Sequence, residues 1–172
     1  MDIIRNRRSI RSFVKGYVIK EEVYKDLLEA AVSAPSAMNG KPWFFIIIND
    51  DAVKEKLTSS VPSISRFLDA SGFIIVAART ENIKSPLYHQ DLSAATENIL
   101  LEATKKKLGS CWIGLKDTKE RIPNIKEILN VPDSIELFSM IALGKPQEED
   151  IFDKPKVREL NDEIINFNGW KK

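Results

Sequence analysis

The sequence predicts an α+β protein, a three-layer α/β/α sandwich in which one sheet lies between two layers of helices. Four apolar segments have the length of strands, and five or six segments between them have the pattern of helices. Two strand segments, Trp43–Ile48 and residues 73–79, are apolar without alternation, which is typical of strands covered on both faces. The length of 172 residues fits a single domain, residues 1–172.

The first third of the chain is expected to hold two helices and one strand. Asp2 can cap a short helix at residues 3–8. Residues 20–33 carry apolar side chains at helical spacing, and this helix should end before the following proline. A turn-rich loop at 34–42 then leads into strand Trp43–Ile48, whose unbroken apolar run places it in the centre of the sheet.

The middle of the chain is expected to contain a capped helix at 52–59, a short helix at 62–69 and the strand at 73–79. Residues 81–88 contain a proline and are expected to be irregular, as in a loop over a ligand. The clearest helix is expected at 90–107, where apolar residues form one face and three lysines suit the dipole at the C-terminal end.

The last third is expected to add strands at 110–115 and 138–143, with a helical region at 118–129 that is broken at Pro123. A C-terminal arm covers about residues 147–172. It is expected to begin as an extended segment and to contain a final helix at 157–166. Its aromatic side chains, Phe167 and Trp170, should pack on the body of the protein or on a second subunit.

Composition limits the function classes. Lys and Arg number 26 and Asp and Glu 25, so no global field favours nucleic acid or an anionic membrane. The single cysteine, Cys111, excludes an internal disulfide framework. No apolar run approaches the roughly 20 residues that span a bilayer, and the N-terminus has no apolar signal segment. We therefore expect a cytoplasmic protein.

Motifs for common catalytic machinery do not occur. There is no Gly-x-Gly-x-x-Gly, no Walker P-loop and no Gly-x-Ser-x-Gly. His89 is the only histidine, which disfavours a histidine-rich metal site and a Ser-His-Asp triad. We expect His89 to lie at the surface and Cys111 to be a buried structural thiol. An enzyme with this inventory needs a cofactor that carries the reaction.

Two basic clusters suggest a phosphate site. The first comprises Arg7, Arg8, Ser9 and Arg11, and the second comprises Lys154, Lys156 and Arg158. Together they can enclose a phosphate from both sides, with a hydroxyl donor from the serine. Ser36 and Asn39 can bond the edge of a flat heterocycle, and Gly109 and Gly114 allow backbone to approach a ring. The alternatives are solvated charge runs and ordinary helix or strand ends.

Four motifs occur in order along the chain. They are Arg-Arg-Ser-Ile-Arg-Ser-Phe from residue 7, Ala-Pro-Ser-Ala-Met-Asn-Gly-Lys-Pro-Trp from residue 34, Leu-Gly-Ser-Cys-Trp-Ile-Gly from residue 108 and Ala-Leu-Gly-Lys-Pro from residue 142. With the terminal Phe-Asn-Gly-Trp, they resemble the FMN-dependent nitroreductase family over residues 2–170. The resemblance implies a central mixed, mostly antiparallel sheet and a homodimer with two FMN sites at the subunit interface.

The resemblance also implies roles for particular residues. Contacts with the phosphate, ribityl chain and pyrimidine of the flavin are expected from Arg7, Arg8, Ser9 and Arg11. The late phosphate-binding pair is expected at Lys156 and Arg158. The loop that reaches the flavin from the other subunit is expected to supply Pro35, Ser36, Met38 and Asn39. Ile113 and Gly114 match the segment in which a backbone N–H can bond flavin N5.

The implied activity is transfer of hydride from NAD(P)H through flavin N5 to a nitroaromatic, quinone or similar acceptor, by a ping-pong mechanism. Lys41 departs from the family, which often has Gln there. This cation either raises the flavin potential or faces solvent. The alternatives are dehalogenation, dehydrogenation or flavin cleavage on the same fold, or a flavin-binding protein without turnover. A nucleic-acid-binding module is the remaining alternative, and the balanced charge disfavours it.

Overall fold

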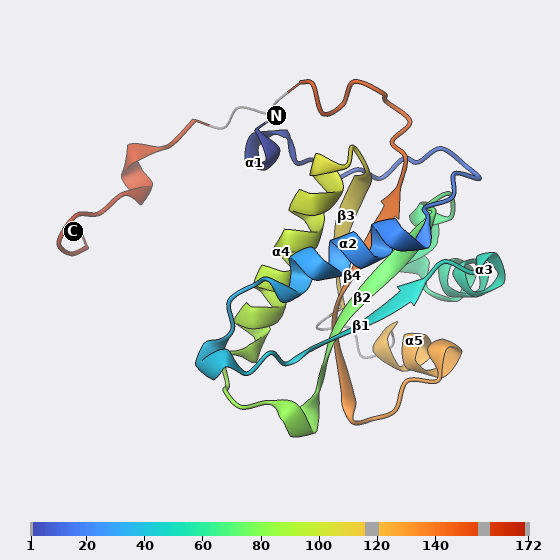
Figure 1. Ribbon diagram of the computed structural model, residues 1–172, viewed down its shortest axis with the longest axis horizontal. Coiled ribbons are helices and arrows are strands. Elements are labelled where there is room, and N and C mark those ends of the chain that lie inside the picture. The colour runs from blue at the N-terminus through green and yellow to red at the C-terminus, as the bar shows by residue number, and fades with distance from the viewer. Residues whose placement is uncertain (1, 116–120, 155–158, 171–172) are drawn as a thin grey trace.

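The protein is built around one antiparallel sheet, seen in a computed structural model that describes residues 2–115, 121–154 and 159–170 (Figure 1). Its strands are β1 (Trp43–Ile48), β2 (Gly72–Arg79), β3 (Gly109–Gly114) and β4 (Ile135–Gly144). They lie in the order β1-β2-β4-β3, and all three neighbouring pairs are antiparallel. The four expected strands and the mostly antiparallel sheet are thus confirmed. The one parallel pairing in the described residues is an isolated bridge between Ser9 and Ser110.

Helices cover both faces of the sheet, which confirms the three-layer sandwich. One layer holds α2 (Glu21–Val32) and α4 (Tyr88–Lys105), which pack against each other. The opposite layer holds α3 (Asp51–Ser60), the 3₁₀ helix η2 (Pro62–Phe67) and α5 (Arg121–Leu129). None of the helices in the described part of the chain is both long and apolar enough to cross a membrane.

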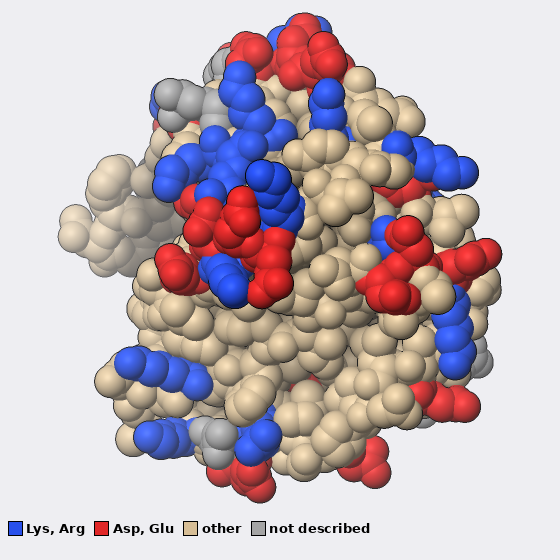
Figure 2. Space-filling model, turned by 45° about the vertical axis from the view of Figure 1, so that its right-hand side comes forward, with Lys and Arg blue, Asp and Glu red and all other residues tan. Residues whose placement is uncertain are grey.

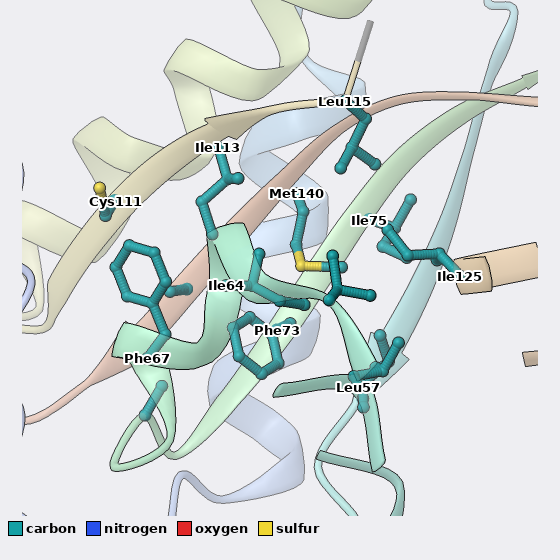
Figure 3. Packing of buried hydrophobic residues seen from close by; sticks show 14 of the residues in the cluster. Leu57, Ile64, Phe67, Phe73, Ile75, Cys111, Ile113, Leu115, Ile125 and Met140 are labelled. Carbon is teal, nitrogen blue, oxygen red and sulfur yellow. The ribbon is translucent and has the colours of Figure 1, made fainter. Parts of the chain in front are cut away.

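A separate hydrophobic core fills each of the two spaces between sheet and helices. Figure 3 shows Phe73, Ile75 and Met140 of the sheet facing Leu57 and Ile64 of the α3–η2 layer. All five side chains are fully buried. Since each such burial stabilises the fold by roughly 1.5–3 kcal/mol, these two cores give a rigid frame for the loops at the sheet edges.

The expected central position of strand Trp43–Ile48 is wrong, because β1 is an edge strand. Most of its side chains are only partly buried, and Ile47 is 36% exposed. Helices on both faces make an edge strand apolar without placing strands on both of its sides. The central strand with continuous burial is β2, whose residues are buried from Gly72 to Ala78.

Helix boundaries agree with the expected ones to within about three residues, with two exceptions. The helix expected at 118–129 is α5, and Pro123 does not break it. A proline in the first helical turn removes no intrahelical hydrogen bond. Residues 118–120 lie outside the described residues. The final helix expected at 157–166 is wrong for the part described, since residues 159–166 contain only the 3₁₀ helix η4 (Asp162–Ile164).

The C-terminal arm leaves the body of the protein (Figure 1). Phe167 and Trp170 are 78% and 86% exposed in the single chain, so the expectation that they pack on the body or on a second subunit stays a prediction. Leu160 and Ile164 are also largely exposed. Exposed apolar side chains grouped on one segment are typical of a surface that contacts another molecule.

The N-terminal arginine segment is fastened to the outer edge of the sheet. After α1 (Ile3–Asn6), Ile10 N donates a hydrogen bond of 2.9 Å to Ser110 O in β3. Phe13 is buried and forms a bridge with Pro146. A Cβ at Gly109 would lie 2.9 Å from a methyl carbon of Ile10, so this glycine is required by the close approach of the segment.

Candidate functional site

The arginine segment lines a cavity of about 510 Å³, which we call the arginine pocket. Its lining residues are Ile4, Arg5, Arg7, Arg8, Ser9, Arg11 and Glu97. Four arginines and one glutamate therefore line the same space. Figure 2 shows basic side chains gathered in the upper part of the molecule, with acidic side chains both above and below them. The local excess of positive charge in the pocket would favour the binding of an anion.

The guanidinium groups are held in different ways. Arg7 Nε lies 3.2 Å from Glu97 Oε1 in α4, and the Arg7 side chain is 23% exposed. Arg8 Nη1 donates to Lys154 O at 3.3 Å, and Arg11 Nη1 donates to Ser9 O at 3.2 Å. Among the described residues, neither Arg8 nor Arg11 has a carboxylate partner in these contacts, so their charge remains available for a ligand.

Two lining residues were not expected. Arg5 is not among the expected site residues, yet it lines the pocket while pairing with Asp2 at 3.1 Å. Glu97 lies off the apolar face of α4 and carries no sequence signal of its own. Two buried polar atoms near the segment, Asn6 Oδ1 and Ser110 Oγ, have no partner among the described residues. Buried polar groups normally find one, so this region is incompletely satisfied in a single subunit.

The free edge of β3 continues from the pocket to Gly114. Ser110, which pairs with Ser9, is four residue steps from Gly114, a distance of about 13 Å along a strand. Ile113 is buried and Gly114 is exposed. A Cβ at Gly114 would meet no atom within 4 Å, and its backbone is not left-handed. Nothing in the described chain requires glycine here, whereas a ring lying against the backbone would.

The loop with the other expected site residues lies at the opposite end of α4 from α1 (Figure 1). Pro35, Met38 and Asn39 are exposed, and Ser36 Oγ accepts from Lys41 N at 3.2 Å. One subunit therefore does not bring these residues to the arginine pocket. The Lys41 side chain is exposed.

The late basic pair, Lys156 and Arg158, lies outside the described residues. The backbone just before it does reach the pocket, because Arg8 bonds the carbonyl of Lys154. The Lys154 side chain instead pairs with Asp150 at 2.6 Å.

The remaining titratable side chains form a separate cluster beside Phe138. His89 is not a free surface residue, since its Nε2 lies 2.8 Å from Glu136 Oε1 and its ring stacks on Phe138. Tyr88 Oη donates to Glu136 Oε2 at 2.7 Å. Burial, aided by this acceptor, raises the pKa of Tyr88 to about 12. Cys111 is buried as expected, and this burial raises the pKa of its thiol.

Comparison with known proteins identifies the family of the chain. A family model described as the nitroreductase family matches residues 4–63 and 59–145. An Archaeoglobus fulgidus protein with the provisional name NADH dehydrogenase/NAD(P)H nitroreductase is 36% identical over 172 residues, which cover 99% of this chain and 98% of that protein.

Two solved structures have the same fold. One is a Clostridium acetobutylicum protein provisionally named NADH oxidase, with a TM-score of 0.89, 36% identity and coverage of 98% of this chain and 100% of that one. The other is an FMN-dependent nitroreductase from Clostridium difficile, with a TM-score of 0.84, 28% identity and 98% coverage of both chains. The family model alone spans more than half of the sequence, and the chain therefore belongs to the nitroreductase family.

Proposed function

We propose that this protein is an FMN-dependent oxidoreductase that uses NAD(P)H. The observation that carries the proposal is the arginine pocket, whose lining residue Ser9 forms a bridge with Ser110 in β3, the strand that leads to Gly114. A ligand with a phosphate at one end and a flat ring at the other suits this arrangement. The FMN-dependent nitroreductase from Clostridium difficile supports the same assignment.

The residues present fit FMN. Arg7, Arg8 and Arg11 would hold the phosphate by charge-assisted hydrogen bonds, and the Ser9 hydroxyl would donate another. Lys156 and Arg158 would close the phosphate site from the arm. The backbone at Ile113 and Gly114 would approach the ring, with an N–H directed at N5, because no side chain at Gly114 intervenes.

The proposed active unit is a homodimer of single-domain subunits. Loop 35–42 lies far from the arginine pocket of its own chain (Figure 1), so Pro35, Ser36, Met38 and Asn39 would contact the ligand of the other subunit. The C-terminal arm offers four exposed apolar side chains for a partner surface. A second copy satisfies both requirements at once. The balanced charge of the chain disfavours nucleic acid and an anionic membrane as partners. The cytoplasm is the location we propose for this dimer.

The chain's own part in the reaction is binding and orientation. FMN, when bound, supplies transfer of hydride from NAD(P)H through N5 to a nitroaromatic, quinone or similar acceptor. The arginines fix the phosphate, and the β3 edge fixes the plane of the ring. The arginine pocket and the β3 edge offer no histidine or second nucleotide motif, which favours a ping-pong use of one position by both substrates in turn.

The test is direct binding of the flavin. Apoprotein mixed with FMN and freed of excess ligand should retain one FMN per chain, and riboflavin should bind much more weakly because it lacks the phosphate. Equal affinity for FMN and riboflavin would remove the proposed role of the arginine pocket.

A further inference from the structure

We propose that Asp91 is a positioning residue that holds loop 36–41 in the shape required for contact with a flavin across the subunit interface. The inference rests on the proposed function and assigns a role in it to a buried carboxylate at the start of α4. Neither a motif nor a charge pattern in the sequence suggests such a role.

The contact that carries the inference joins two segments 54 residues apart. Asp91 Oδ1 accepts a hydrogen bond of 2.9 Å from Ala37 N, at the first residue of the 3₁₀ turn η1 (Ala37–Asn39). Asp91 is only 6% exposed. It lies in the first turn of α4, where the helix dipole favours a negative charge. The rigid helix therefore provides a fixed acceptor for a loop that has no regular pairing of its own.

The loop needs such an anchor because its backbone is strained. Met38, Asn39 and Lys41 have φ values of 54°, 51° and 47°. Of the three other described non-glycine residues with positive φ, Lys107 and Asn130 lie within two residues of the ends of α4 and α5, where this conformation is common, and Asn168 is a single residue in the C-terminal arm. A run of left-handed residues outside a helix end persists only where surrounding contacts impose it, and such runs cluster at ligand sites.

The strained shape displays side chains outward. Met38 is 78% exposed, and the Asn39 side chain is exposed as well. The loop is closed from within by Ser36, whose Oγ accepts from Lys41 N and whose carbonyl accepts from Asn39 N. These bonds set the curvature of the loop, whereas the Asp91 contact sets its position on the body of the protein.

Two substitutions separate positioning from general stability. Asp91→Ala removes the acceptor, and Asp91→Asn keeps a carbonyl oxygen at the same place. Thr58→Val is the matched control, because Thr58 is buried in α3 on the opposite face of the sheet and bonds only its own helix. The measurements are FMN dissociation constants by fluorescence titration, amide hydrogen exchange of residues 35–42 in the apoprotein, and the mass of the native assembly.

Asp91→Ala is expected to raise the dissociation constant of FMN at least about tenfold. It should also abolish the protection of the Ala37 amide from hydrogen exchange, while the mass of the native assembly stays unchanged. Asp91→Asn should stay within about threefold of wild type, and Thr58→Val should lower the melting temperature without changing FMN affinity. Unchanged affinity and unchanged Ala37 protection in Asp91→Ala would overturn the inference. A wild-type protein that binds no FMN would instead overturn the proposed function. In that case, loss of Ala37 protection in Asp91→Ala would still support the role of Asp91 in holding the loop.

Discussion

Arg7 Nε lies 3.2 Å from Glu97 Oε1, and this ion pair joins the N-terminal arginine segment to the side of α4. Isolated surface pairs contribute little to stability. Here the pair aligns one guanidinium beside two others, Arg8 and Arg11, whose hydrogen bonds go to backbone carbonyls. The pocket thus keeps a net positive charge on a rigid support.

Replacement of Arg7 should weaken the flavin phosphate contact. Arg7→Ala is expected to raise the dissociation constant of FMN about ten- to a hundredfold, because a charge-assisted hydrogen bond is lost. Riboflavin affinity should change much less. Lys25→Ala is the control, because Lys25 lies on the exposed face of α2, where its ammonium group pairs with Glu21. An equal loss for FMN and riboflavin would show that Arg7 acts on the fold and not on the phosphate.

Replacement of two glycines by alanine should change the free energy of unfolding to different degrees. At Gly72 a Cβ would collide with Tyr24 Oη and lie 2.7 Å from Ile48 O, so Gly72→Ala should destabilise the protein by roughly 1–3 kcal/mol. At Gly114 there is open space, so Gly114→Ala should leave unfolding within about 1 kcal/mol of wild type.

For FMN binding, in contrast to unfolding, Gly114→Ala is the variant with the large expected effect. Gly114→Ala should weaken FMN by at least about tenfold, because the new methyl group occupies the proposed ring position. Chemical denaturation and fluorescence titration of both variants provide the measurements. Full FMN affinity in a folded Gly114→Ala protein would exclude close approach of the ring to this residue.

Tyr88 should make stability fall at alkaline pH. Its pKa is raised from 10 to about 12 in the folded protein. Between these two values the unfolded chain has lost the proton while the folded protein still holds it. The stabilisation is therefore complete below pH 10 and is lost as the pH rises toward 12. Tyr88→Phe should show a shallower decline of unfolding free energy between pH 9.5 and about 11.5 than wild type. Parallel declines in the two proteins would contradict this.

The C-terminal arm should be required for the dimer. Each large apolar side chain that leaves water contributes roughly 1.5–3 kcal/mol. A Phe167→Ser, Trp170→Ser double variant should therefore dissociate into monomers at a much higher protein concentration than wild type does. Sedimentation velocity over a range of concentrations measures this. Glu163→Ala, a polar change on the same arm, should leave the dimer intact. A wild-type chain that is monomeric at all concentrations would contradict the proposed assembly.

The sequence was most informative where local patterns decide the structure. The apolar runs identified all four strands, and the arginine segment identified the pocket, because composition and motif order are local properties. The position of β1 could not be predicted, since an apolar run reports burial by helices and not the number of neighbouring strands. Within the described residues 159–166 the expected helix is absent apart from η4, because a short amphipathic segment is marginal without a surface to pack on.

Contacts between distant segments carried no sequence signal. Glu97 resembles an ordinary solvent-facing glutamate until Arg7 is placed beside it. The left-handed backbone of Met38 and Lys41 could not be expected from residue types that rarely adopt it. The same holds for Asp91, whose partner is an amide 54 residues away. Each of these features depends on how the helices and loops pack in three dimensions.

The measurement that tests the central claim most directly is a visible spectrum of the FMN-loaded protein during anaerobic titration with NADH and then NADPH. We expect an oxidised flavin spectrum that at least one nicotinamide bleaches, with recovery of colour on addition of a quinone or nitroaromatic compound. A protein that takes up no FMN, or one whose bound flavin neither nicotinamide reduces, would contradict the proposed oxidoreductase.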